Sequence, residues 1–218
     1  METKYLKIDR DDPNISYQAR QYKTLRLKAL ELSPTAFSST LQIESAFPEE
    51  TWISRITDPL KETFICVVTS DQGVSEWAAQ VTLRGPIAAD DYQLPAGSGQ
   101  SAPLPDEIQE KWQMLSLYTL PGYRGKGLGK KLCQTAFEFL ARKSGIAPSI
   151  QVRIMVKAEN QVTLGLYGSM GFVRTGTCTL EEALSANGDS DLIPPAPLPD
   201  LFTRRGGVIM ALDIARQF

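Results

Sequence analysis

The sequence contains no histidine, and this absence removes several kinds of chemistry. Ser–His and Cys–His nucleophilic pairs need an imidazole base, and protein zinc sites commonly use imidazole ligands. Any acid–base catalysis in this chain therefore falls to carboxylate, tyrosine, lysine, cysteine or water. We expect no metal site.

The sequence also has few cysteines, a small net charge and no long apolar run. The three cysteines (Cys66, Cys133 and Cys178) lack metal or redox spacing, which indicates buried thiols in a reducing compartment. The N-terminus has no apolar signal core, and no apolar run is long enough to span a bilayer. The formal charge of −2 gives no nucleic-acid or membrane signature. We expect a protein of the cytoplasm or nucleus that binds neither nucleic acid nor membrane.

The composition is that of one ordinary globular domain over residues 1–218, because 218 residues with 42% hydrophobic residues can bury a full core. Two stretches, at about 85–110 and 179–207, are rich in Pro, Gly or Ser and carry several acidic residues. Loops of this length are usually functional or disordered. Two interpretations stay open for these irregular insertions: solvated loops, or an acidic rim that collects a cationic amine.

Hydrophobic periodicity predicts an alternation of strands and helices. Amphipathic spacing predicts a helix over residues 15–32, with Asn14 available as its cap, and a shorter helix that begins near Pro48. Apolar or alternating runs predict strands at 4–8, 64–69, 77–83, 112–120, 150–156, 173–178 and 208–214. The strands at 64–69 and 77–83 form a hairpin.

The most informative stretch is a strand, a glycine-rich turn and a helix. The strand at 112–120 ends at Pro121, the turn covers 122–129, and a helical pattern follows from Leu128. Such a turn presents backbone N–H groups beside a helix N-terminus, which is an anion-binding arrangement. The nucleotide-triphosphate loop does not fit, because Leu128 stands where its lysine belongs. The dinucleotide fingerprint fails on spacing, since the glycines are Gly125, Gly127 and Gly129.

Two motifs carry a resemblance to a known family. Arg124-x-x-Gly127-x-Gly129 resembles the acetyl-coenzyme-A pyrophosphate loop of the GNAT N-acetyltransferase superfamily. The stretch from Asn160 through Leu166-Tyr167 to Gly171-Phe172 is similar to that family's second hallmark, with Thr163 where alanine is usual. A softer similarity covers the two N-terminal helices. Two hallmarks at the expected separation identify the chain as a member of the superfamily.

The resemblance implies an α/β (α+β) GNAT fold: a mixed, mostly antiparallel twisted sheet of about six to seven strands with about four helices, splayed at the coenzyme site. It implies acetyl-coenzyme A as co-substrate, with the strand backbone of Leu117, Tyr118 and Thr119 pairing with the pantetheine amides. It further implies that Tyr167 is the general acid for the leaving thiolate. The implied coenzyme-binding set also includes Asn160, Tyr167 and the loop residues Arg124, Gly125, Lys126, Gly127, Leu128, Gly129 and Lys130.

The general base and the acceptor are less determined. Many family members carry a glutamate on the strand before the loop, where this chain has only Ser116, so Glu76 is the candidate base and a water chain is the alternative. The expected reaction is direct acetyl transfer to a primary amine on a small molecule or a peptide, in a ternary complex. The main alternative is a coenzyme-binding domain that senses or scaffolds. A nucleotide-phosphate binder is disfavoured by Leu128. Monomer or homodimer, and acetyl or longer acyl donor, stay open.

Overall fold

The computed structural model describes residues 2–37 and 39–217. Within these residues there are seven strands: β1 (Glu2–Lys7), β2 (Lys61–Thr69), β3 (Ser75–Ile87), β4 (Gln109–Thr119), β5 (Ser149–Lys157), β6 (Val173–Cys178) and β7 (Gly207–Ala215). The same residues form eight α-helices: α1 (Ile15–Leu32), α2 (Leu41–Ser45), α3 (Glu49–Thr57), α4 (Ala89–Tyr92), α5 (Leu128–Arg142), α6 (Gln161–Gly168), α7 (Leu180–Asn187) and α8 (Asp200–Thr203). The strands pair in the order β1-β2-β3-β4-β5-β7-β6. The predicted fold class is confirmed, with more short helices than expected.

The chain divides into two compact units. One consists of residues 1–83 and 116–136, and the other of residues 84–115 and 137–218. Strands β3 and β4 and helix α5 each give residues to both units. Each unit is described by itself below.

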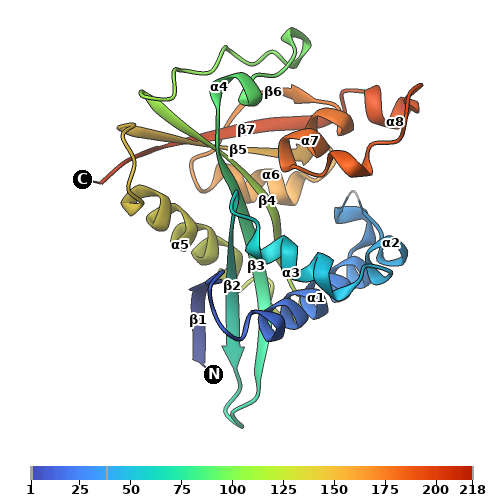
Figure 1. Cartoon of the computed structure of the whole chain (residues 1–218), viewed down its shortest axis with the longest axis vertical. Helices are drawn as coiled ribbons and strands as arrows, with labels where there is room; N and C mark the ends of the chain where they lie inside the picture. The colour runs from blue at the N-terminus through green and yellow to red at the C-terminus, as the bar shows by residue number, and fades with distance from the viewer. Residues whose placement is uncertain (1, 38, 218) are drawn as a thin grey trace. The chain divides into compact units, whose positions relative to one another are not determined.

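In the first unit, β1 pairs antiparallel with β2 from Glu2↔Thr69 to Lys7↔Phe64, and α1 lies beside α3 (Figure 1). Apolar side chains on the inner faces of α1 and α3 meet strand β2 in a core of Ile8, Ala19, Tyr22, Trp52, Ile56 and Ile65. Helix α3 follows Pro48 as predicted. Asn14 is the N-cap residue of α1, as predicted, but its side chain makes no capping hydrogen bond. Its backbone N–H instead donates to Asp12 Oδ1 at 2.7 Å, in a turn that precedes the helix.

In the second unit, β7 lies between β5 and β6 and pairs antiparallel with both (Figure 1). The residues of β4 that belong to this unit pair in parallel with β5, from Gln109↔Ser149 to Gln113↔Arg153. Mixed parallel and antiparallel pairing is what the family resemblance implies. Leu94, Cys178 and Ile209 form a small core cluster in this unit, and Met155 packs against it.

The two stretches that we expect to be irregular contain helical turns. Helix α4 lies in the first stretch, and α7 and α8 lie in the second. Helix α7 begins with a capping box, in which the Thr179 side chain accepts from the Glu182 N–H and the Glu182 side chain accepts from the Thr179 N–H. It ends at Gly188, which has a φ of 78°. Thr-x-x-Glu before a helix and Gly after it are readable start and stop signals, so the expectation of irregularity for this part is wrong.

The three cysteines are free and buried, as predicted. Burial raises the pKa of the Cys133 thiol to about 12 and that of Cys66 to about 11. Both thiols are therefore protonated, and weakly nucleophilic, at neutral pH.

Among the helices in the described part of the chain, none has the length and apolar character that crossing a membrane requires.

Candidate functional site

The glycine loop lies in the first unit between β4 and α5. Gly125 and Gly127 have φ values of 74° and 75°, which favour glycine. A Cβ atom added at either residue would find no heavy atom within 4 Å, so each glycine faces open space rather than a packed neighbour. The first turn of an α-helix also has N–H groups without intrahelical acceptors, and α5 begins directly after this loop at Leu128. A backbone concavity beside a helix N-terminus fits an anionic group.

The side chain of Arg124 forms hydrogen bonds between the glycine loop and residues outside it. Its Nε donates to the carbonyl oxygen of Thr119 at 3.0 Å, and its Nη2 donates to Ser33 Oγ at 3.1 Å. The guanidinium also lies 5.3 Å from the centre of the Tyr118 ring, and the Tyr118 hydroxyl is 3.0 Å from the same Ser33 oxygen. The side chain of Arg124 thus joins the end of β4 to the end of α1. Its backbone N–H donates to the Pro121 carbonyl oxygen at 3.2 Å, so this N–H is not available for the predicted coenzyme contact.

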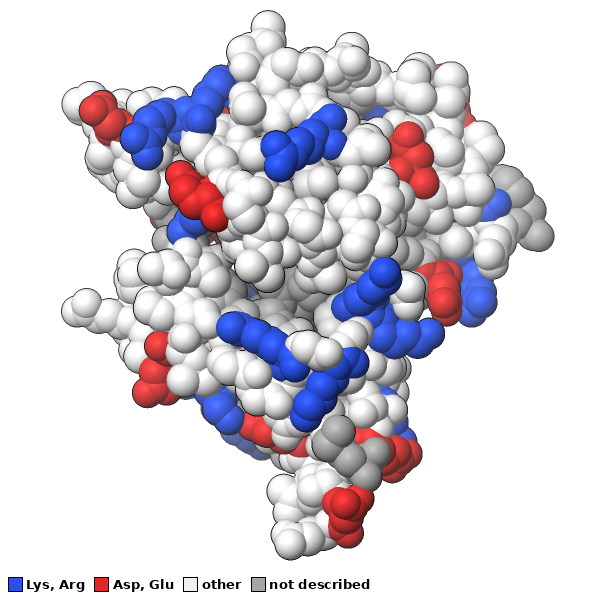
Figure 2. All heavy atoms as spheres, turned by 180° about the vertical axis from the view of Figure 1, so that it is seen from behind, with Lys and Arg blue, Asp and Glu red and all other residues white. Residues whose placement is uncertain are grey.

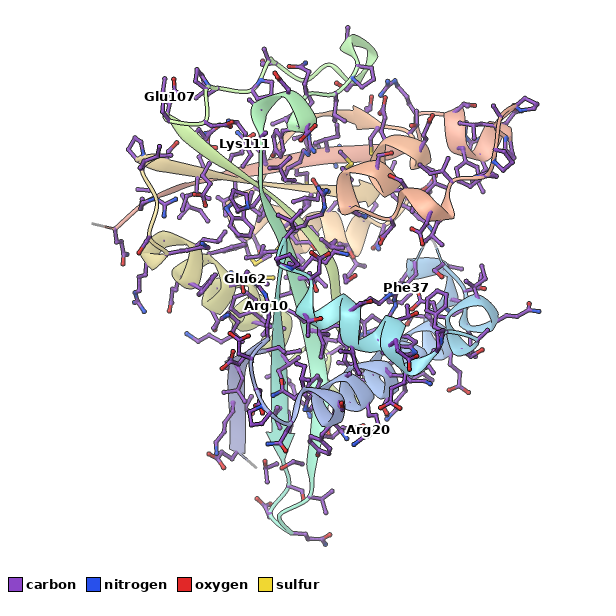
Figure 3. All side chains as sticks on the ribbon, in the orientation of Figure 1. Arg10, Arg20, Phe37, Glu62, Glu107 and Lys111 are labelled. Carbon is purple, nitrogen blue, oxygen red and sulfur yellow. The ribbon has the colours of Figure 1, made fainter. Side chains whose placement is uncertain are left out.

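An aromatic contact extends this arrangement beyond the residues predicted from the sequence. The Phe37 ring, labelled in Figure 3, packs against Tyr118 with ring centres 5.5 Å apart. The Arg26 guanidinium lies 4.3 Å from the centre of the Phe37 ring. Neither Ser33 nor Phe37 stands in a motif, because both reach Tyr118 only through the tertiary fold.

Strand β4 changes conformation just before the predicted pantetheine segment. Its parallel register with β5 ends at Gln113↔Arg153, and Ser116 has a φ of 56°. Among the described residues, Ser116 is the only non-glycine residue with a positive φ. A residue in this region costs on the order of 1–3 kcal/mol and is held by its surroundings. Leu117, Tyr118 and Thr119 follow directly, so the segment predicted to bind the coenzyme begins at a strained residue.

Helix α6 carries Tyr167 in the second unit. Its N-cap is Asn160, whose side chain accepts from the Thr163 N–H at 3.1 Å, and this accounts for an asparagine at the start of the second motif. Tyr167 is buried, and its ring centre lies 5.3 Å from that of Phe172. Phe172 in turn packs against Phe137 with ring centres 5.9 Å apart. The tyrosine is therefore held in an aromatic cluster, and its catalytic role stays a prediction.

Glu76, the candidate base, has two partners in the first unit. Lys28 Nζ donates to its Oε1 at 2.7 Å, and the Tyr123 hydroxyl donates to its Oε2 at 2.9 Å. The hydrogen bond from Lys28 lowers the pKa of Glu76, partial burial opposes this, and Tyr123 lowers the pKa further. A carboxylate with a lowered pKa accepts a proton less readily. The role of Glu76 as the base stays a prediction, and this geometry favours the water chain.

Acidic residues of the two insertions are partly neutralised within the second unit. Asp106 accepts from Lys111 Nζ at 2.6 Å, and Arg205 Nη2 donates to Glu182 Oε1 at 2.7 Å. Figure 2 shows lysine, arginine and acidic side chains interspersed on the face that it displays. These ion pairs reduce the charge that an acidic rim would offer to a cationic amine.

Comparisons with known proteins place the chain in a class. The fold is that of an acyltransferase, with a glycine loop that fits an anionic group. The model of the acetyltransferase (GNAT) family matches residues 45–172, more than half of the chain. The chain therefore belongs to the acetyltransferase (GNAT) family. A search of curated proteins finds no match.

Solved structures show the same fold at low sequence identity. A GNAT-family acetyltransferase from Streptococcus pneumoniae superposes with a TM-score of 0.60 and 16% identity, over 98% of this chain and all of the other. The ribosomal-protein-S18-alanine N-acetyltransferase from Escherichia coli gives a TM-score of 0.54 and 16% identity, over 100% of this chain and 97% of the other. The putative acetyltransferase yncA from Salmonella typhimurium, solved with its cofactor acetyl-CoA, gives 0.53 and 12%, over 100% and 97%.

Proposed function

We propose that this protein transfers an acetyl group from acetyl-coenzyme A directly to a primary amine. The observation that carries the proposal is the pair of positive-φ glycines, Gly125 and Gly127, which face open space directly before helix α5 in a chain of the GNAT family. A solved structure of the same fold contains acetyl-CoA, which supports this choice of co-substrate.

The residues of the first unit fit the coenzyme. Backbone N–H groups from Gly125 to Gly129 would hold the pyrophosphate, since the Arg124 N–H donates to Pro121. Lys126 and Lys130 bring positive charge to the same segment. The backbone of Leu117 to Thr119 would bind the pantetheine amides as an added strand does. When bound, the coenzyme supplies an acetyl group activated as a thioester.

The residues of the chain then transfer protons and orient the two reactants. The amine must lose a proton before it attacks, because a lysine-like amine is charged at pH 7. Its nitrogen forms a bond to the thioester carbonyl carbon, the carbon–sulfur bond breaks, and Tyr167 donates a proton to the departing thiolate. The proton released by the amine leaves through water or Glu76. Orientation of the two reactants contributes much of the remaining acceleration.

A coenzyme-binding protein with a sensing or scaffolding role is the second candidate. It is favoured by one feature, the absence of a carboxylate on the described residues Met114 to Thr119 of β4. The two partners that engage Glu76 add to it.

Isothermal titration of acetyl-coenzyme A tests the co-substrate. We compare the wild type with Gly127→Glu, which places a carboxylate where the pyrophosphate would lie. Gly73→Glu is the matched control, because Gly73 has a φ of 80° and equally open space but lies in the β2–β3 turn. We expect Gly127→Glu to weaken binding by roughly a hundredfold, since like charges cost several kcal/mol, and Gly73→Glu to bind like the wild type. Equal binding by all three proteins would overturn the assignment of the loop.

Tyr167→Phe separates the enzyme from the sensor. Coenzyme thiol release is followed across a panel of amines, with Tyr17→Phe as the control because Tyr17 is exposed on α1. We expect Tyr167→Phe to lower kcat by about 100-fold with little change in coenzyme binding. Coenzyme binding by the wild type without turnover of any amine would favour the sensor.

A further inference from the structure

A buried arginine in the second unit has no acidic partner within the described residues. Arg153 on β5 is only 1% exposed. Its Nε donates to Gln113 Oε1 at 2.9 Å, its Nη1 donates to the Tyr92 carbonyl oxygen at 2.8 Å, and its guanidinium stacks 3.7 Å from the centre of the Tyr92 ring. All three contacts are with uncharged groups, and among the described residues no aspartate or glutamate forms an ion pair with Arg153. A guanidinium keeps its charge in proteins, so burial without an anion is costly.

A second guanidinium increases that cost. Arg84 is half-buried, and its Nη1 donates to the carbonyl oxygen of Ala186, near the C-terminus of α7, at 3.2 Å. Gly188 lies against it, because a Cβ there would approach Arg84 Nε to 2.7 Å. Burial lowers the pKa of Arg153, Tyr92 and Cys178 oppose this, and the charge of Arg84 adds to the lowering. Two positive charges therefore act on each other beneath the end of α7.

Other polar groups beside Arg153 are oriented or have hydrogen-bonding capacity that the described residues do not use. The Gln113 amide is oriented by donating to Asn187 Oδ1 at 3.2 Å, which turns its oxygen to Arg153. A guanidinium has five N–H donors, and the described residues accept from two of those of Arg153. The Tyr92 hydroxyl is buried and has no hydrogen-bond partner within the described residues. A buried hydroxyl without a hydrogen-bond partner is destabilising, and a ligand that bonds to it removes this cost.

This group of residues lies at the end of the β4–β5 ladder. Gln113↔Arg153 is the last pair of the parallel register. Three residues further along β4 is the strained Ser116, and the segment from Leu117, which we propose to bind pantetheine, follows it.

We infer that Arg153 and Arg84 bind the carboxylate of the acetyl acceptor, so the acceptor is an amine that carries a carboxylate, such as an amino acid. This inference rests on the proposed function. A carboxylate supplies an anion for both guanidiniums. It also accepts hydrogen bonds from the Arg153 N–H groups that donate to no described residue. An acceptor of this kind carries mixed charge, unlike the cationic amine that an acidic rim would collect.

The test compares amino acids with the amines that lack only the carboxylate. The pairs are phenylalanine and phenethylamine, leucine and isoamylamine, and lysine and cadaverine, each measured by coenzyme thiol release with the full chain. We expect kcat/KM to be about 10- to 100-fold higher for the carboxylate-bearing member of at least one pair, as hydrogen bonds to charged groups imply. A preference for the decarboxylated amine in every pair, or equal values, would overturn the inference while leaving the proposed function intact.

Substitutions locate the effect. Arg153→Met should raise KM for the amino acid without changing KM for acetyl-coenzyme A. The ratio of kcat/KM for the amino acid to kcat/KM for its decarboxylated amine should then fall close to one. Arg84→Gln, at a half-buried position, should reduce this ratio and serves if Arg153→Met does not fold. Arg174→Gln, at an exposed position on β6, is the control and should keep the full preference. An unchanged preference in Arg84→Gln and in folded Arg153→Met contradicts the assignment.

A binding measurement covers the case of no turnover. The shift in thermal unfolding midpoint is measured with each N-acetylated amino acid and its N-acetylated amine, in the presence of coenzyme A. A shift that requires the carboxylate and is absent in Arg84→Gln supports the site. The absence of any carboxylate-dependent shift in the wild type overturns it. Loss of coenzyme binding itself would instead contradict the proposed function.

Discussion

Arg26 in the first unit and Arg153 in the second are both buried, but only Arg26 forms an ion pair with a carboxylate among the described residues. In the first unit, Arg26 is 8% exposed, and its Nε and Nη2 donate to the two oxygens of Glu44 at 3.0 and 2.6 Å. Arg55 Nη1 donates to the same carboxylate at 2.9 Å. In the second unit, Arg153 is 1% exposed and contacts only uncharged groups.

The presence or absence of a carboxylate partner indicates two different roles. The paired Arg26 stabilises the fold, and Arg153 is the arginine that we propose to bind a ligand. A fully buried carboxylate that receives two arginines has its charge compensated, and such networks hold segments in one arrangement. The Arg26–Glu44 pair ties α1 to α2 beside the Phe37–Tyr118 contact. No carboxylate in the described part of the chain compensates Arg153, so its charge destabilises the free protein, and an anionic ligand would remove that cost.

Glu44→Gln should produce the largest change in stability. The substitution keeps the shape of the side chain but leaves Arg26 and Arg55 without their carboxylate. We expect a loss of about 3 kcal/mol in the free energy of unfolding, because removing one partner of a buried ion pair leaves uncompensated charge. Urea unfolding followed by circular dichroism measures it.

Glu49→Gln is the matched control for that measurement. Glu49 pairs with Arg20 at 3.1 Å, but both side chains are more than half exposed. Exposed pairs contribute about 0–1 kcal/mol, so this variant should unfold close to the wild type. Equal losses in the two variants would contradict the structural role given to Glu44.

Arg26→Met and Arg153→Met make the comparison directly, with a smaller expected difference. Arg26→Met removes the bidentate partner of Glu44 and should destabilise the free protein by about 3 kcal/mol. Arg153→Met removes an uncompensated charge together with two hydrogen bonds, so we expect a loss below about 2 kcal/mol. The same unfolding assay compares the two. A larger loss for Arg153→Met would show that Arg153 is the more structural of the two arginines.

The pH dependence of stability gives the smallest expected effect. Burial raises the pKa of Glu44, but the hydrogen bond and charge of Arg26, with the charge of Arg55, outweigh burial and hold the pKa below its ordinary value of 4.5. The stabilisation is therefore present above pH 4.5 and is lost as the pH falls through the lower pKa of the folded state. Unfolding free energies measured from pH 6 down to pH 3 should converge for wild type and Glu44→Gln. Parallel curves would exclude Glu44 as the titrating group.

Much of the fold follows from local signals in the sequence. The strands and main helices lie where hydrophobic periodicity predicts them, because period 2 and period 3.6 are properties of neighbouring residues. The glycine loop is also local: positive φ at Gly125 and Gly127 depends on residues within one turn. The same holds for the Asn160 cap, whose partner is three residues away. The capping box of α7 is also a local signal, but it lies in an acidic and Pro-rich stretch whose composition favours loops.

The candidate site was only partly predictable, because long-range partners decide it. Glu76 lies next to its predicted strand, but its pKa depends on Lys28 and Tyr123, which are 48 and 47 residues away. Ser33 and Phe37 reach Tyr118 from another segment. Neither feature leaves a periodic signal in the sequence.

The sequence by itself determined the family, the glycine loop and the order of the elements, since each depends on residue types at short, fixed spacing. The tertiary structure alone decided which buried charges are compensated. Arg26 and Arg153 are each an arginine among apolar neighbours in the chain, and only the packing of distant segments brings Glu44 to one and uncharged groups to the other. Electrostatic energy depends on distance and burial in space, and those quantities are set by the fold.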